Sequence, residues 1–146
     1  MSKIQVKVVL EEGVQLPKYE TAGAAGLDVR ANIPESITLG SLERALIPTG
    51  IRMAIPEGYE VQVRPRSGLA LKHGITLLNT PGTIDSDYRG ELKIIIANMS
   101  KQPYVIEAQE RIWQLVLNKV EQMELEIVSS LDETVRGEGG FGHTGK

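Results

Sequence analysis

The chain has 146 residues and a mass of 16.0 kDa, which is the size of one domain of ordinary dimensions. Its 41% hydrophobic and 24% charged content excludes global disorder, and a formal net charge of −3 argues against a surface that coats DNA or RNA. The lack of cysteine excludes disulfides and thiolate metal sites, and no apolar run approaches the roughly 20 residues that span a bilayer. We therefore expect a cytoplasmic protein whose partners include neither nucleic acid nor a membrane.

Short apolar segments separated by turns run along most of the chain. They are rich in Val, Ile and Leu, several alternate with a period of two, and proline and glycine separate them. The first alternates instead of forming the apolar block of a signal peptide. Residues 123–127 also alternate, so we interpret the stretch 111–128 as β rather than helical. The predicted strands are residues 4–10, 27–31, 43–47, 51–55, 59–64, 75–78, 91–97, 104–107 and 111–117.

One short helix is predicted among these strands. Residues 67–73, Ser-Gly-Leu-Ala-Leu-Lys-His, form one or two helical turns, and Gly74 ends them. Many short strands joined by turns that contain Gly and Pro are typical of an antiparallel sandwich, jelly roll or barrel. Neither an internal repeat nor a linker is visible, which indicates one domain.

The C-terminal segment departs from this pattern. The chain has 15 glycines and a single phenylalanine, and five of the glycines lie with Phe141 in the last ten residues. Glycine loses much backbone entropy on ordering, so residues 136–146 are predicted to form a flexible arm. On composition it is either a disordered tail or an arm that folds over a ligand, with Arg136, Phe141 and Thr144 as contacts. The segment lacks the spacing of an ordinary P-loop.

The stretch 79–91 carries the most informative polar residues. It reads Asn-Thr-Pro-Gly-Thr-Ile-Asp-Ser-Asp-Tyr-Arg-Gly-Glu and precedes an apolar strand, which predicts a hairpin. A polar turn with Asp85 or Asp87 as turn former explains it when it stands alone. The pair of carboxylates beside Tyr88 also fits a group that deprotonates a water molecule.

A second stretch, residues 64–70, suits the binding of a phosphate. It holds Arg64 and Arg66, followed by Ser67 and Gly68 at the predicted start of the helix. Guanidinium groups, a hydroxyl and backbone N–H groups together can hold such an anion. The alternative is a solvated strand end with Ser67 as the helix N-cap.

Two further stretches carry little information singly. Residues 25–31 are a turn that enters a strand, and residues 109–115 are a strand. A strict period of two places Arg111 and Trp113 on one face of the latter strand and Gln114 on the other.

Taken in order, the five stretches resemble the five motifs of the trimeric dUTP pyrophosphatases (dUTPases), from residue 25 to residue 145. This resemblance implies an all-β fold, a jelly-roll-like antiparallel β-barrel of the dUTPase-like (β-clip) type with one short helix. It also implies a homotrimer with a site at each subunit junction. A barrel domain, residues 1–135, then carries an arm, residues 136–146, that closes over such a site.

The implied reaction is the hydrolysis of dUTP to dUMP and pyrophosphate, with Mg²⁺ on the triphosphate. It supplies dUMP for thymidylate synthesis and keeps uracil out of DNA. Asp85 matches the general base, which deprotonates the water that attacks the α-phosphorus. Asp28 matches an acidic residue that reaches the metal through water, since Mg²⁺ keeps several waters and few protein ligands.

The substrate contacts are likewise implied by the resemblance. Asn79, with backbone groups of Thr83, Ile84 and Asp85 and those around Lys93, matches a uracil pocket in which cytosine would leave buried groups unpaired. Tyr88 matches the residue under the deoxyribose, where a ribose 2′-hydroxyl would clash. Phe141 matches the side chain that stacks on uracil. The phosphate contacts match Arg66, Ser67, Gly68, Gln114, Arg136, Gly142 and Thr144.

One position departs from the family pattern, because His143 stands where the family usually has serine. Three alternatives compete with dUTP hydrolysis. A dCTP deaminase of the same fold needs a glutamate at the position of Ile95, which cannot move protons. A non-catalytic dUTP sensor has no use for the general base that Asp85 provides. A structural β-trimer would require the five ordered matches to be accidental.

Overall fold

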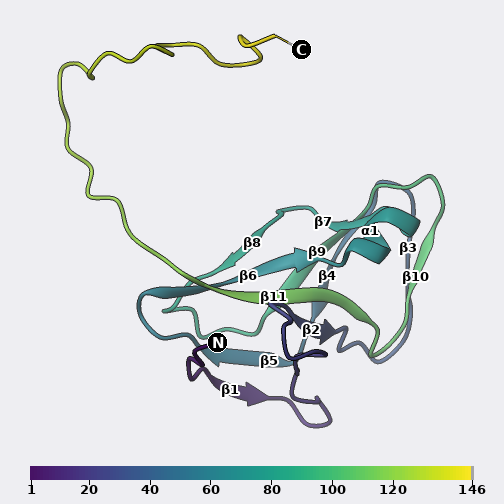
Figure 1. The fold of residues 1–146 in the computed structure, drawn as a ribbon. Helices are drawn as coiled ribbons and strands as arrows, with labels where there is room; N and C mark the ends of the chain where they lie inside the picture. The colour runs from purple at the N-terminus through teal and green to yellow at the C-terminus, as the bar shows by residue number, and fades with distance from the viewer. Residues whose placement is uncertain (146) are drawn as a thin grey trace.

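The computed structural model describes residues 1–145, which contain eleven strands and one short helix, α1 (Ser67–His73) (Figure 1). The last residue of the predicted arm, Lys146, lies outside the described residues. No helix within residues 1–145 is long and apolar enough to cross a membrane. The strands are β1 (Lys7–Leu10), β2 (Leu27–Arg30), β3 (Ile37–Leu39), β4 (Arg44–Pro48), β5 (Ile51–Ala54), β6 (Tyr59–Pro65), β7 (Ile75–Leu77), β8 (Gly82–Ile84), β9 (Lys93–Asn98), β10 (Tyr104–Ile106) and β11 (Arg111–Lys119).

Every strand pair is antiparallel, and the strands form two larger sheets and two ribbons. One sheet has the order β2-β11-β6-β8 and the other has the order β4-β9-β7. The ribbons pair β1 with β5 and β10 with β3. Consecutive strands are therefore often placed in different sheets, as in a jelly roll, and the predicted mostly β class with one short helix is confirmed.

The core lies between the sheets and is built from aliphatic side chains of alternating strand positions. Trp113, the largest buried side chain, is fully buried together with Ile47, Ile96 and Ile106. Buried Asn98 at the end of β9 donates to the carbonyls of Leu39 and Gln102 at 2.9 and 2.8 Å, so its amide is satisfied. The core thus fixes β9, a strand that also lines the candidate site.

Two strands were absent from the sequence prediction. Strands β3 and β8 have three residues each, and β8 begins at Gly82 directly after Pro81, two residues that favour a turn. The bounds predicted for the helix are those observed, and Gly74 ends it in the left-handed conformation at φ 65°.

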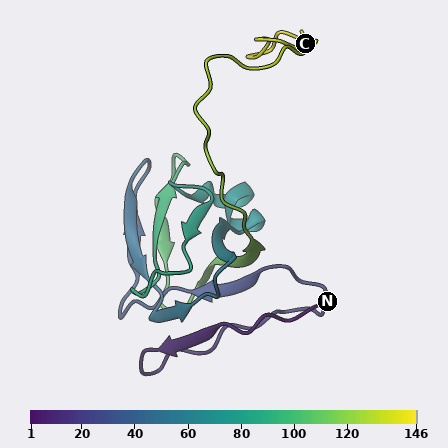
Figure 2. The ribbon, with the colours of Figure 1, turned by 90° about the vertical axis from the view of Figure 1, so that its left-hand side faces the viewer.

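The chain beyond β11 leaves the barrel as an extended segment (Figures 1 and 2). Residues 121–138 are exposed throughout, and the side chains of Met123, Leu125 and Ile127 are 85, 82 and 99% exposed. The β interpretation of residues 120–128 is therefore wrong for a single chain, because β11 ends at Lys119 and no strand within residues 1–145 pairs with this segment.

Gln109 adopts a left-handed backbone conformation at φ 64°, where a side chain is strained. Replacing it with glycine should raise the free energy of unfolding by about 0.5–1 kcal/mol, since the relief of strain exceeds the added freedom of the unfolded chain. Urea unfolding at fixed protein concentration measures this difference. The matched reverse change, Gly58→Ala at φ 85°, should destabilise by a similar amount. An unchanged or lowered stability of Gln109→Gly would contradict the expected strain.

Candidate active site

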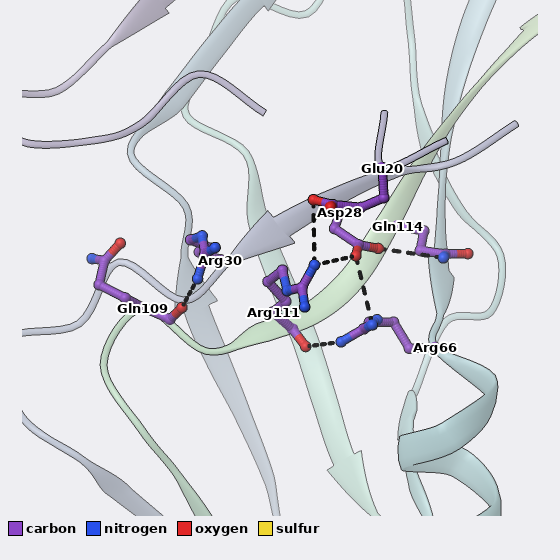
Figure 3. Close-up of polar contacts among 7 residues, drawn as sticks. All are labelled: Glu20, Asp28, Arg30, Arg66, Gln109, Arg111 and Gln114. Carbon is purple, nitrogen blue, oxygen red and sulfur yellow. Dashed lines mark hydrogen bonds and ion pairs between the residues drawn. The ribbon is translucent and has the colours of Figure 1, made fainter. Parts of the chain in front are cut away.

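A cluster of charged and amide side chains surrounds Asp28 on β2 (Figure 3). The Asp28 side chain is only 8% exposed. Arg111 Nη1 donates to its Oδ2 at 3.3 Å, and Arg66 Nη2 lies 3.6 Å from the same oxygen. Gln114 Nε2 donates to Oδ1 at 3.3 Å. We call these four residues the Asp28 cluster.

A β-bulge in β11 creates this arrangement. Gln114 stands opposite Asp28 of β2 on one side and Arg64 of β6 on the other. The register shifts between Arg111 and Trp113, which brings Arg111 to the same face as Gln114. The expectation that Arg111 and Gln114 lie on opposite faces is therefore wrong, because it assumed an uninterrupted period of two.

The guanidinium group of Arg66 is held at two points. In addition to Asp28, it contacts the carbonyl of Arg111, to which its Nη1 donates at 2.9 Å. The Arg111 guanidinium is shared in turn between Asp28 and Glu20, whose Oε1 lies 3.3 Å away. Arg66 remains 31% exposed, so a fixed cation faces solvent beside the start of α1.

The start of α1 presents Ser67 and Gly68 to solvent. Arg66 is the N-cap with extended backbone angles, and Ser67 is the first helical residue. The alternative of an N-cap Ser67 is wrong, and no side chain caps this helix. A Cβ added at Gly68 would meet nothing within 4 Å. Packing within the protomer therefore does not explain the glycine, whereas close approach of a ligand to its backbone would.

A second group of predicted residues lines a cavity of about 380 Å³ between β8 and β9. Six predicted site residues share this cavity with the position of Ile95. The hairpin prediction is wrong, because β8 pairs with β6 whereas β9 pairs with β4 and β7 in another sheet, so the stretch 79–91 contains β8 and a loop between two sheets. Asp85 stands at the end of β8, exposed, and its carbonyl accepts a hydrogen bond from the Tyr88 N–H at 3.2 Å. The predicted residues at the cavity are Asn79, Thr83, Ile84, Asp85, Tyr88 and Lys93.

The backbone edges that face this cavity lack strand partners within residues 1–145. Strand β8 is the edge of its sheet and pairs only with β6. Strand β9 pairs with β7 only over Ile96–Asn98, which leaves Lys93 and Ile94 open on that side. A flat ring with alternating donors and acceptors can therefore insert between two strand edges that already display such groups.

Within one protomer the two groups lie at opposite ends of β6. The register pairs Val61 with Ile84, so Asp85 continues opposite Glu60, whereas Arg66 follows the other end of the strand. From Glu60 to Arg66 a strand rises about 20 Å at roughly 3.3 Å per residue. Figure 1 likewise separates the end of β8 from α1.

The arm residues contact neither group in the described chain. Arg136 Nε donates to the carbonyl of Gly139 at 2.8 Å, and the His143 N–H donates to the carbonyl of Gly140 at 3.1 Å. Phe141 is fully exposed. The arm therefore forms only local turns and carries its predicted ligand contacts, Gly142 and Thr144 included, far from the barrel (Figure 2).

The acidic side chains that the structure describes do not form a site that would hold Mg²⁺ directly. Residues 1–145 contain no group of three or more His, Asp or Glu side chains placed to hold a metal ion. Asp28 supplies a single carboxylate, and two guanidinium groups already contact its Oδ2. Such a residue fits a hydrated Mg²⁺ that is carried mainly by phosphates and is reached through water.

Three residues of these sites were missed by sequence reasoning. Arg111 reaches Asp28 because of the bulge in β11, and Glu20 contacts Arg111 from a loop. Neither a bulge nor a loop gives a periodic signal in the sequence. Gly90 appeared only as a turn residue, yet it lies directly against the ring of Tyr88.

Comparison with known proteins agrees with this geometry. A dUTPase family model matches residues 12–145. The deoxyuridine 5′-triphosphate nucleotidohydrolase of Fusobacterium nucleatum is 72% identical over 146 residues, with all of both chains covered. That of Finegoldia magna is 56% identical over 142 residues, which is 97% of this chain and 99% of the relative.

Solved structures show the same fold. The Staphylococcus bacteriophage 80alpha dUTPase with dUPNHPP has a TM-score of 0.83 and 27% identity, and the match covers 99% of this chain and 100% of that one. A variant dUTPase from phage phi11 of S. aureus, described with a structural Mg(II) ion, has a TM-score of 0.79 and 25% identity, with 89% and 100% covered. The fold is thus that of the dUTPases, which confirms the predicted fold class. The chain belongs to the dUTPase family.

Proposed function

We propose that this protein hydrolyses dUTP to dUMP and pyrophosphate, as a dUTP diphosphatase. The observation that carries the proposal is the β8–β9 cavity, where unpaired strand edges lie beside the exposed carboxylate of Asp85. Family membership and relatives named for this activity support it. The reaction supplies dUMP for thymidylate synthesis and keeps uracil out of DNA.

Uracil binds between β8 and β9. The Asn79 amide and the backbone from Thr83 to Asp85 and around Lys93 meet the acceptor, donor and acceptor along its pairing edge. Cytosine offers a different pattern and would leave buried groups unpaired, which costs about 1–3 kcal/mol per group. Tyr88 packs under the deoxyribose.

Asp85 is the general base that takes a proton from the attacking water. Such a base must reach the water by a hydrogen bond, so the α-phosphorus lies within one water of its carboxylate. Arg66, Ser67, Gly68 and Gln114 bind phosphate oxygens. Arg66 reaches them from a position that Asp28 already fixes, so it loses little freedom on binding.

The site is shared between copies of the chain. Because Asp85 and Arg66 stand about 20 Å apart along one protomer, they cannot contact the same phosphate group. The β8–β9 loop of one subunit and the Asp28 cluster of another therefore form each site. The family resemblance sets the number of copies at three, as a homotrimer.

Residues 1–135 form the barrel domain and residues 136–146 the arm that closes a site at a subunit junction. Its exposed Phe141 stacks on uracil, while Arg136, Gly142 and Thr144 reach phosphate oxygens. The extended path of residues 121–135 gives the arm the reach to arrive at another copy.

Mg²⁺ accompanies the triphosphate and neutralises part of its charge. Asp28 would hold the hydrated ion through water, which suits a carboxylate whose Oδ2 already has two guanidinium partners, and the ion would supply positive charge to the phosphates. We assign the protein to the cytoplasm, where dUTP is formed.

Deamination of dCTP is the less favoured function. Ile95 lies at the same cavity, at the position where a deaminase of this fold needs a glutamate, and it offers no group that accepts a proton. Ammonia release from dCTP would support deamination instead.

Pyrophosphate release from dUTP, dTTP, dCTP and UTP, each with and without Mg²⁺, tests the function. We expect turnover of dUTP in the presence of Mg²⁺ and rates at least about 10²-fold lower for the other three, because each presents a misplaced or additional group to a fixed pocket. Equal rates on all four nucleotides would contradict the assigned pocket.

A further inference from the structure

Gly90 lies in the loop that joins β8 to β9, and its backbone conformation does not require a glycine. Seven other glycines of residues 1–145 have a positive φ, whereas Gly90 lies outside the left-handed region. An L side chain therefore fits its backbone, and the reason for a glycine must be space.

The space above Gly90 is filled by Tyr88. A Cβ built on Gly90 would lie 2.6 Å from Cζ and 3.0 Å from Cε2 of the tyrosine ring, and would also collide with its hydroxyl. Real Cβ atoms essentially never come this close to another atom, so the half-exposed Tyr88 ring must shift if Gly90 gains a side chain. Gly90 thus provides the surface on which the Tyr88 ring rests.

Tyr88 is held at its backbone and at the hydroxyl end of its ring. The Tyr88 N–H donates to the carbonyl of Asp85 at 3.2 Å, and its hydroxyl donates to the carbonyl of Glu91 at 2.9 Å. Tyr88 is 46% exposed, so a side chain at Gly90 would push the ring outward and break the hydroxyl contact without opening the core. The expected damage is local, which makes the position testable.

We propose that Gly90 is a positioning residue that sets the selectivity for deoxyribose, by seating the ring of Tyr88. This inference rests on the proposed function, in which Tyr88 packs under the sugar. A 2′-hydroxyl adds a single oxygen atom, so a pocket rejects it only if the wall that it meets cannot yield. The glycine surface and the Glu91 carbonyl together remove that freedom from the ring.

Gly90→Ala tests the proposal, with Gly23→Ala as matched control. Gly23 is exposed, its φ lies outside the left-handed region, and an added Cβ meets nothing within 4 Å. We expect the ratio of kcat/KM for dUTP over UTP to fall about tenfold or more in Gly90→Ala, chiefly through KM, and to stay unchanged in the control. An unchanged ratio in Gly90→Ala would overturn the proposal.

A double-mutant cycle with Tyr88→Ala separates seating from any other effect at Gly90. Once the ring is removed, Gly90→Ala should change the dUTP/UTP ratio no further. An equal effect of Gly90→Ala with and without the ring would overturn the proposal. If Gly90→Ala lowers the melting temperature of the wild type, it should not lower that of Tyr88→Ala, because the ring that clashes is absent there. An equal drop in both backgrounds would count against the clash.

A readout without turnover distinguishes this inference from the proposed function. The Tyr88 ring resonances of the nucleotide-free protein, recorded by NMR, should shift in Gly90→Ala and not in Gly23→Ala. A wild type that hydrolyses no dUTP defeats the proposed function, and with it the selectivity role. A wild type that discriminates between dUTP and UTP, with unshifted Tyr88 resonances in Gly90→Ala, defeats only the role of Gly90.

Discussion

Asp85→Asn is expected to lower kcat for dUTP by about 10²–10⁴-fold while dUTP affinity stays within roughly tenfold. The amide keeps the shape of the carboxylate but cannot accept the proton of the attacking water. Single-turnover pyrophosphate release measures the chemical step, and calorimetric titration with dUTP measures binding. Near-normal turnover would exclude Asp85 as the base.

Asp87→Asn is the matched control, since it removes the same charge from the same exposed turn. Its turnover should stay within a few-fold of wild type. A loss equal to that of Asp85→Asn would mean that the total charge of the β8–β9 loop, rather than one carboxylate, supports the reaction.

Mixing two inactive variants extends this test to the shared site. Asp85→Asn supplies an intact Asp28 cluster, and Arg66→Ala supplies an intact β8–β9 loop. If Asp85 and Arg66 of one site come from different copies, as proposed, subunits exchanged between the variants should form some sites with both groups intact and recover part of the activity. No recovery after verified exchange would show that each site takes both residues from one chain.

Deletion of residues 136–146 is the second change for which we expect a large effect on turnover. Turnover should fall by about 10²-fold or more, because the open site loses its contacts to uracil and phosphate and admits water. The thermal unfolding midpoint should stay near that of wild type, since Arg136 and His143 bond only within the arm. Pyrophosphate release and circular dichroism measure the two quantities.

Phe141→Ala serves as the graded control for the deletion. It removes one exposed aromatic side chain and should lose part of the activity, on the order of tenfold, for a stacking contact of about 1–3 kcal/mol. Unfolding of the truncated protein would instead mean that the arm belongs to the core.

The sequence predicted the features that depend on neighbouring residues. Helix α1 has the predicted bounds because Gly74 ends it by a local conformation that a side chain disfavours. Strand β6 was recognised because Val61 and Val63 point inward between polar residues. The predicted residues between Asn79 and Lys93 meet at one cavity because they are close in the chain.

Features that depend on distant parts of the chain could not be predicted in this way. The bulge that turns Arg111 toward Asp28 arises from pairing between β11 and β2, which are far apart in sequence. The separation of Asp85 from Arg66 follows from the register of β8 on β6. The order of the motifs in the sequence is the same whether two motifs meet within one protomer or between two. It therefore does not distinguish a site within one chain from a site shared between chains.

In the proposed assembly, the exposed segment after β11 would make the stability of this protein depend on its concentration. Met123, Leu125 and Ile127 stand in water in a lone protomer, and burial would stabilise each by about 1.5–3 kcal/mol. In the proposed assembly that gain is available only after association, so mass action governs it. Melting temperatures of variants are therefore comparable only at equal subunit concentration, and dilution should leave this segment open to proteases before the barrel unfolds.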